Sequence, residues 1–245
     1  MPSRSRARSA EESRLRDAIV DAGRRLGTRG LIAAGEGNLS IRVDDDRLLI
    51  TPSGRRKDKL SPHDLVVVPR RAPGEIVDRT SAPQPSSDIA IHRAIYAART
   101  DVLAVTHAHL PAAMGLTLAG IVPDPAVLPE TALLLPRLPF VPFAPAGSAE
   151  LAGAVADTLA DGSPLPGAVL LERHGAVAVG EATGGADSAL TQAVDRLELV
   201  EVLCRTWRDA LLLRGAATGS GSGTILRPPD ASPGCPARGR QRRRP

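Results

Sequence analysis

Apolar residues recur at helical spacing near both ends of the chain. In residues 11–26 they fall three or four positions apart, which predicts an amphipathic helix that stops at Gly27. A longer stripe from Leu190 to Leu211 predicts a final helix that Gly215 closes. Shorter helices are predicted over residues 87–98, 111–118 and 148–160.

Between these segments, short apolar runs are separated by turn residues. Residues 39–43 and 48–51 flank an aspartate-rich turn and predict a β-hairpin. Further strands are predicted over residues 65–68, 102–109, 168–172 and 176–179, with a short one near Ile76. The proline-rich segment 122–145 is interpreted as a crossing connection. The pattern predicts one α/β domain whose helices cover a sheet rich in antiparallel pairs.

The net charge of +4 and the pI of about 9.8 would suggest a nucleic-acid-binding protein. However, the unopposed arginines lie in residues 1–9 and 231–245, so the body between them is mildly acidic. We therefore expect no specific nucleic-acid-binding face. We divide the chain into a basic disordered tail at 1–9, a folded domain at 10–214 and a disordered tail rich in Gly, Pro and Arg at 215–245.

Two cysteines, Cys204 and Cys235, are too few for a disulfide framework. No apolar run follows the basic N-terminal segment, and no stretch approaches the length of a membrane span. These features predict a cytoplasmic protein without a membrane partner.

Three of the five histidines lie where a metal ion could be held. His107 and His109 end an apolar strand, and because strand side chains alternate, both imidazoles leave the same face. His174 also follows an apolar strand, and Gly175 after it permits a close approach to a neighbouring segment. Three protein ligands with one open position are typical of catalytic zinc. The alternative is three ordinary, partly buried histidines.

Three small polar segments could form a phosphate cradle beside such an ion. They are Gly35–Asn38, Ser53–Gly54 and Ser86–Ser87, each of which offers backbone N–H groups or hydroxyls. We expect Ser87 to cap the helix that follows, where amides and dipole favour an anion. Each segment alone would be an ordinary turn. Asp88 could act as a general base or a fourth metal ligand, or be simply a first-turn acid.

These segments, in this order, resemble the class II aldolase/adducin family. The matching stretches are Ala34–Arg42, Leu49–Gly54, Pro85–His92, Thr106–His109 and Glu172–Gly175, followed by a long final helix. The resemblance implies a three-layer α/β/α sandwich with a largely antiparallel or mixed sheet. It also implies a homotetramer with active sites between neighbouring subunits.

The resemblance further implies a Zn²⁺ ion held by His107, His109 and His174, with Mn²⁺ or Co²⁺ as alternatives. Asp88 would be the acid/base. The residues implied to bind the phosphate of a small sugar substrate are Gly37, Asn38, Ser53, Gly54, Ser86 and Ser87.

The function predicted first is a zinc-dependent aldolase that cleaves a ketose 1-phosphate, similar to L-fuculose 1-phosphate, to dihydroxyacetone phosphate and an aldehyde. A pentulose-phosphate 4-epimerase or a methylthioribulose-1-phosphate dehydratase on the same scaffold is the alternative, because Asp88 stands where the aldolase carries glutamate. The family's aldolase also uses tyrosine proton donors, whereas the one tyrosine here, Tyr96, lies elsewhere. Glu130 is a candidate replacement. A non-catalytic, adducin-like interaction domain is the third hypothesis.

Overall fold

The computed structural model describes residues 4–71 and 83–219, apart from the side chains of 4–7 and 217–219. Over these residues, seven strands form one sheet in the order β3-β2-β1-β4-β7-β6-β5. All neighbouring strands are antiparallel except β5 and β6, which are parallel. The strands are β1 (Asn38–Arg42), β2 (Arg47–Ile50), β3 (Val66–Pro69), β4 (Val102–Ala108), β5 (Phe140–Val141), β6 (Ala168–Leu171) and β7 (Gly175–Glu181).

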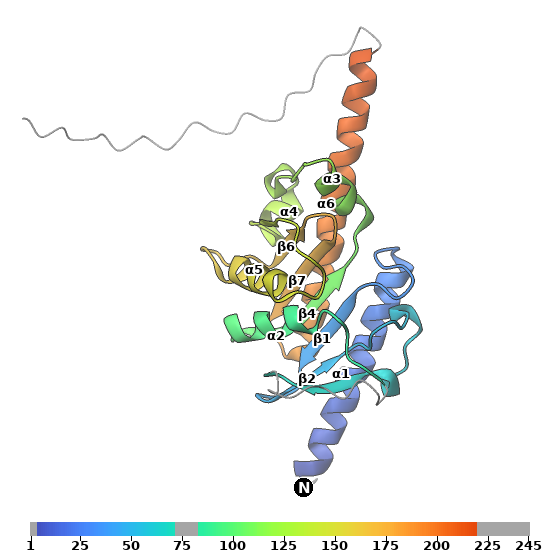
Figure 1. The fold of residues 1–245 in the computed structure, drawn as a ribbon, viewed down its shortest axis with the longest axis vertical. Coiled ribbons are helices and arrows are strands. Elements are labelled where there is room, and N and C mark those ends of the chain that lie inside the picture. The colour runs from blue at the N-terminus through green and yellow to red at the C-terminus, as the bar shows by residue number, and fades with distance from the viewer. Residues whose placement is uncertain (1–3, 72–82, 220–245) are drawn as a thin grey trace, which may run out of the picture.

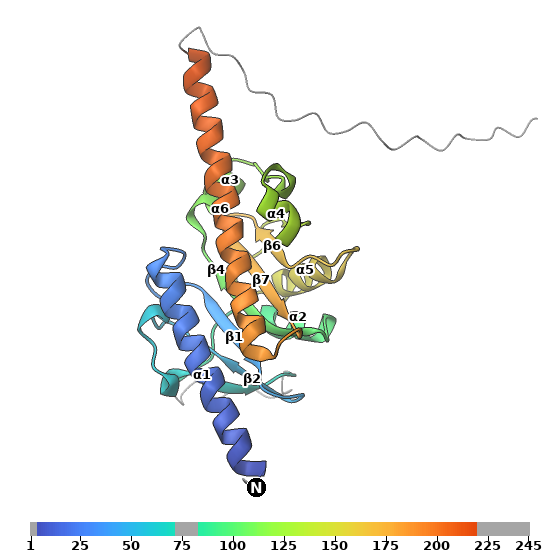
Figure 2. The ribbon, with the colours of Figure 1, turned by 180° about the vertical axis from the view of Figure 1, so that it is seen from behind.

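Helices cover both faces of this sheet, so the predicted three-layer α/β/α arrangement is confirmed (Figures 1 and 2). The helices are α1 (Arg4–Thr28), α2 (Ile89–Ala98), α3 (Pro111–Leu118), α4 (Pro129–Leu134), α5 (Ala149–Ala160) and α6 (Ala186–Gly219). α1 and α6 lie together on one face, and α2 and α5 on the other. Short 3-10 turns complete the described elements: η1 (Lys57–Lys59), η2 (Pro62–Asp64) and η3 (Pro125–Val127).

Side-chain alternation along the central strands separates two hydrophobic cores. Small residues such as Ala104 and Ala178 face α6, whereas Val105 and Val177 pack toward α2 and α5. At Gly180 a Cβ would come within 1.8 Å of the Ala189 carbonyl oxygen, so α6 can lie this close only over glycine. His107 shares the face of Val105, because the two residues are separated by two positions. The alternation therefore directs His107 toward the α2/α5 side.

The chain ends differ from the prediction. α1 begins at Arg4, so residues 4–9, expected as a disordered tail, are helical; no Gly or Pro interrupts the segment, and Arg8 pairs with Asp44 at 2.9 Å. α6 runs through Gly215 to Gly219, which moves the boundary placed at 214/215. Gly215 does not take the left-handed conformation of a C-cap, so it does not close the helix. Residues 220–245 lie outside the described part.

Two further predictions need correction. α2 begins at Ile89 with Asp88, not Ser87, as its N-cap, and the Asp88 carboxylate makes no cap hydrogen bond. The crossing at 122–145 contains η3, α4 and the edge strand β5, which its prolines did not reveal. The strand expected near Ile76 lies outside the described residues. Over the part of the chain that the structure describes, none of the helices combines the length and apolar composition that crossing a bilayer requires.

Glu201 of α6 anchors the helix that follows the predicted metal ligands. Its carboxylate is buried and accepts hydrogen bonds from Ala112 N at 3.1 Å and Ala113 N at 3.4 Å, both in the first turn of α3. Arg205 donates to the same carboxylate at 2.8 Å. Because α3 starts two residues after His109, this contact ties the end of β4 to α6.

We predict that Glu201→Ala lowers the free energy of unfolding by about 2–3 kcal/mol, because it leaves two buried N–H groups without an acceptor. Glu201→Gln keeps an acceptor oxygen and should lose less than half of that amount. Denaturant unfolding followed by circular dichroism measures both. An alanine variant within about 0.5 kcal/mol of the wild type, the range of an ordinary surface substitution, would show that the contact does not hold α3.

Candidate metal centre

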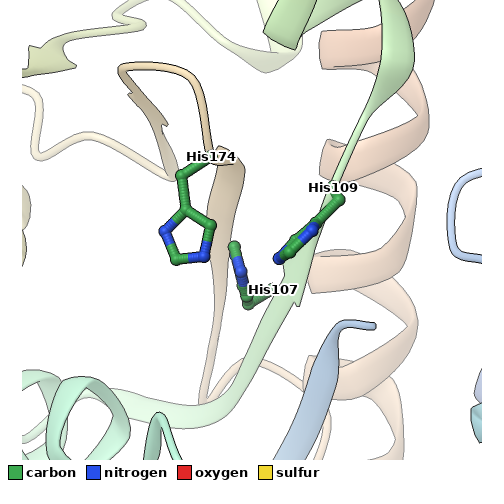
Figure 3. A group of neighbouring side chains, drawn as sticks. All are labelled: His107, His109 and His174. Atoms are coloured by element: carbon green, nitrogen blue, oxygen red, sulfur yellow. The ribbon is translucent and has the colours of Figure 1, made fainter. Parts of the chain in front are cut away.

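Strand pairing brings the three histidines together. In the β4–β7 pair, His107 lies opposite Val177 and Ala108 opposite Ala176, so the end of β4 lies beside the turn that begins β7. His174 occupies that turn. The three ring centroids are 4.7–5.0 Å apart, and one nitrogen of each ring lies within 4.8 Å of the other two (Figure 3). The convergence predicted from three separated positions is present.

His107 fits a metal ligand best. Its ring is buried, and its Nδ1 is 2.9 Å from the carbonyl oxygen of Ala176, to which it must donate because a carbonyl only accepts. In the neutral ring Nε2 is then an unprotonated acceptor. It is the one buried side-chain N or O atom, among the described residues, without a hydrogen-bond partner. Burial, reinforced by His174 and His109, holds the pKa of His107 well below its usual value. A buried neutral nitrogen without a donor is suited to a cation.

His174 is brought close by an unusual backbone. Gly175 has φ 105°, and a Cβ there would lie 2.1 Å from Ala108 O and 2.8 Å from the Cα of His109. The close approach predicted at this glycine is therefore confirmed. Arg173 before it also has a positive φ, 58°, so the turn is held in a conformation that most residues avoid. Burial, and then the nearby His109, lowers the pKa of His174.

A cavity of about 330 Å³ opens beside His109 and His174. It is lined by Gly35, Glu36, Gly37, Asn38, Ser53, Gly54, Lys57, Ser86, Ser87, Asp88, His109, Ala146 and His174. The three polar segments thus meet in one cavity, although they come from three parts of the chain. Two backbone hydrogen bonds join the loop of Ser53 to the loop of Ser86, from Ser53 N to Gln84 O at 3.0 Å and from Ser86 N to Thr51 O at 3.1 Å. Phosphate binding by the six predicted residues stays a prediction.

Asp88 lies in the cavity wall, only 8% exposed, and accepts a hydrogen bond from Asn38 Nδ2 at 2.9 Å. Among the described residues, the donor atoms close enough to share one ion are those of the three histidines and do not include Asp88. Its role as a fourth ligand therefore stays a prediction.

A buried chain of hydrogen bonds fixes Asn38. Its amide must turn the NH₂ group to the Asp88 carboxylate, so its oxygen accepts from His92 Nε2 at 2.5 Å. His92 Nδ1 then accepts from Ser40 Oγ at 2.6 Å, and the Tyr96 hydroxyl lies 2.9 Å from the same Oγ. Burial lowers the pKa of His92 to about 3 and raises that of Tyr96. Because both ring nitrogens of His92 have partners in this chain of hydrogen bonds, His92 is a structural residue.

The structure changes the interpretation of two residues. The sequence pattern did not single out Lys57, and the structure places it in the wall of the cavity. The sequence feature that could have drawn attention to Lys57 is composition, because Lys57 and Lys59 are the only lysines among 31 basic residues. Glu130 lies exposed in the first turn of α4 and does not line the cavity of its own subunit.

The family model for the Class II Aldolase and Adducin N-terminal domain matches residues 17–208. The chain belongs to this family. The match spans the central sheet, the three histidines and every residue that lines the cavity. The resemblance noted from five short segments is thereby confirmed, and so is the class II aldolase fold. The family includes enzymes of several activities that depend on a metal, and the histidine cluster agrees with this.

Relatives within the family carry out different reactions. The chain is 34% identical over 200 residues to a 3-oxo-tetronate 4-phosphate decarboxylase from Cupriavidus necator, a match covering 80% of this chain and 84% of that one. It is 38% identical over 94 residues to a methylthioribulose-1-phosphate dehydratase from Methylococcus capsulatus, covering 38% and 44%. Its fold is similar to L-fuculose-1-phosphate aldolase from Thermus thermophilus, with a TM-score of 0.68, 29% identity and coverage of 86% and 98%.

We predict that Gly175→Ala weakens metal binding by at least about tenfold, because the new methyl group would collide with the Ala108 carbonyl and push His174 away from His109. Gly153→Ala is the control: it also lies in the described body, in α5, and no atom stands within 4 Å of its Cβ position. Competition with a chromophoric chelator measures affinity. Equal affinity in both variants would refute the steric account.

A second prediction concerns pH. Protons compete with the metal for imidazole, and three ligands of ordinary pKa near 6.5 would lose affinity by up to about a thousandfold per pH unit in acid. Because the pKa values of His107 and His174 are lowered, both stay neutral below pH 6.5. Chelator competition between pH 6.5 and 5.5 should therefore show a clearly shallower loss. A loss of about a hundredfold or more over this pH unit, as three imidazoles of ordinary pKa would give, would contradict it.

Proposed function

We propose that this protein is a zinc-dependent lyase that breaks the bond between the α and β carbons of a small phosphorylated ketone. The substrate class we favour is a 3-oxo acid phosphate similar to 3-oxo-tetronate 4-phosphate. The observation that carries the proposal is the convergence of three imidazoles, one with a buried unpartnered nitrogen, at the edge of a cavity lined by the three small polar segments. The relationship to the decarboxylase over most of both chains supports the choice of substrate.

Decarboxylation and aldol cleavage make the same product fragment. When 3-oxo-tetronate 4-phosphate loses CO₂, the C1–C2 bond breaks and its electron pair remains on C2 as the enediolate of dihydroxyacetone phosphate. Cleavage of L-fuculose 1-phosphate leaves the same enediolate, with an aldehyde as the departing fragment. Protonation of the carbon completes either reaction. The proposal therefore keeps the chemistry first predicted and changes the leaving group.

In this scheme His107, His109 and His174 hold the ion. When bound, the ion supplies the Lewis acid that stabilises negative charge developing on the substrate's carbonyl oxygen. The backbone and hydroxyl groups of Gly37, Asn38, Ser53, Gly54, Ser86 and Ser87 bind the phosphate. Asp88, held by Asn38 in the cavity wall, delivers to C2 the proton that it takes up from solvent.

The side chains that could transfer a proton in the cavity favour decarboxylation over aldol cleavage. Aldol cleavage must remove a proton from the hydroxyl of the departing aldehyde, whereas CO₂ departs without one. Tyr96, the only tyrosine, is fully buried and bonded to Ser40. Glu130 is outside the cavity. Neither residue considered for the second proton transfer reaches the cavity of its own subunit.

The other readings receive less support. The dehydratase match covers 38% of this chain, so methylthioribulose 1-phosphate is the second candidate substrate. The pentulose-phosphate epimerase stays an alternative on the same scaffold, and a non-catalytic adducin-like role leaves the histidine cluster unexplained. We further propose a cytoplasmic homotetramer. Exposed Leu133 and Leu134 on α4 support a subunit contact there, and Glu130 would act only across such a contact.

We predict that the zinc-loaded protein releases CO₂ and dihydroxyacetone phosphate in equal amounts from 3-oxo-tetronate 4-phosphate. Its kcat/KM should exceed that for L-fuculose 1-phosphate by about 10²-fold or more. Asp88→Asn should lower kcat by about 10²- to 10⁴-fold with metal content unchanged, because it removes the proton donor. His107→Ala should lose both metal and turnover. A coupled reductase assay and CO₂ detection measure the products.

Each outcome separates the readings. Dihydroxyacetone phosphate formed from L-fuculose 1-phosphate, with no CO₂ from the 3-oxo acid, would return the assignment to an aldolase. Loss of water from methylthioribulose 1-phosphate would favour the dehydratase. Full activity in His107→Ala would remove the metal from the mechanism.

A further inference from the structure

We propose that Lys57 supplies the positive charge that binds the substrate's phosphate, an inference that rests on the function proposed above. Lys57 lines the cavity together with all six residues predicted to bind phosphate. The described lining otherwise carries two carboxylates, Glu36 and Asp88, and contains no other lysine and no arginine. Without this ammonium group, the charged side chains of the described lining would all repel a phosphate dianion, and only the metal ion proposed at the cavity edge would attract it.

The ammonium of Lys57 is buried and incompletely partnered. The residue is 2% exposed, and Nζ donates to Gly35 O at 2.7 Å and to Arg55 O at 2.8 Å. An ammonium has three protons to donate, so one remains after these two bonds. Within the described residues Lys57 has no carboxylate within 4.0 Å, the limit for a salt bridge. Because a buried cation without a counter-ion is unfavourable, a bound anion would supply the missing partner.

The neighbouring cations are engaged elsewhere. Arg55 pairs with Asp64 at 2.9 Å and Arg56 pairs with Asp58 at 2.8 Å, and both guanidinium groups belong to exposed side chains. Lys57 alone of this basic run turns inward. Burial lowers the pKa of Lys57, and the charge of Asp88 raises it. The proposed anion site thus contains the ammonium of Lys57, which forms no salt bridge with the carboxylates around the cavity.

The position of Lys57 also links two of the phosphate loops. Gly35 belongs to the loop that continues to Gly37 and Asn38, and Arg55 follows directly after Ser53 and Gly54. α1 fixes the backbone of the lysine, since a Cβ at Gly23 would come within 2.3 Å of Lys57 O. The two loops and the ammonium are therefore set relative to one another before any anion binds, which reduces the ordering that binding requires.

Residue choice in the rest of the chain supports a specific role. Only two of the 31 basic residues are lysines, Lys57 and Lys59, and they lie in the same 3-10 turn. An ammonium is a compact charge on a flexible stem, whereas a guanidinium is a wide planar group. The enclosed position between two loop carbonyls suits the compact group.

The first test uses Lys57→Met in the full-length, zinc-loaded protein, with inorganic phosphate as a competitive inhibitor. Loss of a charged hydrogen-bond donor should raise the Ki of phosphate and the KM of the substrate by about 10- to 100-fold, while kcat changes less. Lys59→Met is the matched control, because Lys59 is exposed two residues away; it should stay within about twofold, as surface charges do. An unchanged Ki in Lys57→Met overturns the proposal.

The second test needs no variant and keeps the inference falsifiable if Lys57→Met does not fold. The wild-type protein is treated with an amine-acylating reagent, and modification of the two lysines is followed by mass spectrometry. Inorganic phosphate should slow modification of Lys57 at least about tenfold and leave Lys59 unaffected, because only Lys57 lines the cavity. Protection by acetate but not by phosphate would overturn the proposal in favour of a carboxylate site.

The modification test is independent of turnover. Phosphate protection of Lys57 in a protein that decarboxylates no 3-oxo acid would support the role of Lys57 and refute the proposed reaction. Decarboxylation without any effect of phosphate on Lys57 would do the reverse.

Discussion

The histidine cluster depends on the antiparallel register between β4 and β7, since this pairing joins histidines that lie 67 positions apart in the chain. A slip of one residue would turn His107 to the α6 face and leave His174 beside the wrong partner. Gly175 lets the turn that carries His174 approach the Ala108 carbonyl. Any side chain at this position would prevent that contact. The arrangement of ligands is therefore a consequence of backbone hydrogen bonding and of one missing Cβ.

The two faces of the sheet differ in how they pack: one is covered closely by α6, and the other holds a buried chain of hydrogen-bonded side chains. On the α6 face, alanines and Gly180 allow a long helix to pack closely against the central strands, and hydrogen bonds such as that from Thr106 Oγ1 to Ala193 O at 3.3 Å also join the strands to the helix. On the opposite face, the buried chain from Asp88 through Asn38 and His92 to Ser40 and Tyr96 carries the polar side chains. Because every buried polar atom in that chain has a partner, it orients Asp88 without a large penalty from burial. The unpartnered Nε2 of His107 stands out against this background.

Much of this could be predicted from local pattern. Alternation placed His107 and His109 on one face, and apolar periodicity gave most helices to within a few residues. The residues used to place the helix ends were less informative. Gly215 lies inside α6, and the Arg-rich start of the chain is helical. A glycine or a charged residue favours a helix boundary but does not determine it. The meeting of three loops and the burial of Lys57 depend on contacts between distant segments, which one sequence does not display.

The distribution of groups around the cavity also suggests why one scaffold serves several reactions. The three histidines and the small polar segments that line the cavity lie at strand ends and in the turns beside them, where they would suit the fragment that decarboxylation and aldol cleavage share. The leaving group needs different partners in each case: none for CO₂, a proton acceptor for an alcohol. In the proposed homotetramer, those partners would come from the crossing at 122–145 or from a neighbouring subunit. Among the described residues, none between 122 and 145 lines the cavity, so that segment could differ between relatives while the residues around the cavity stay the same.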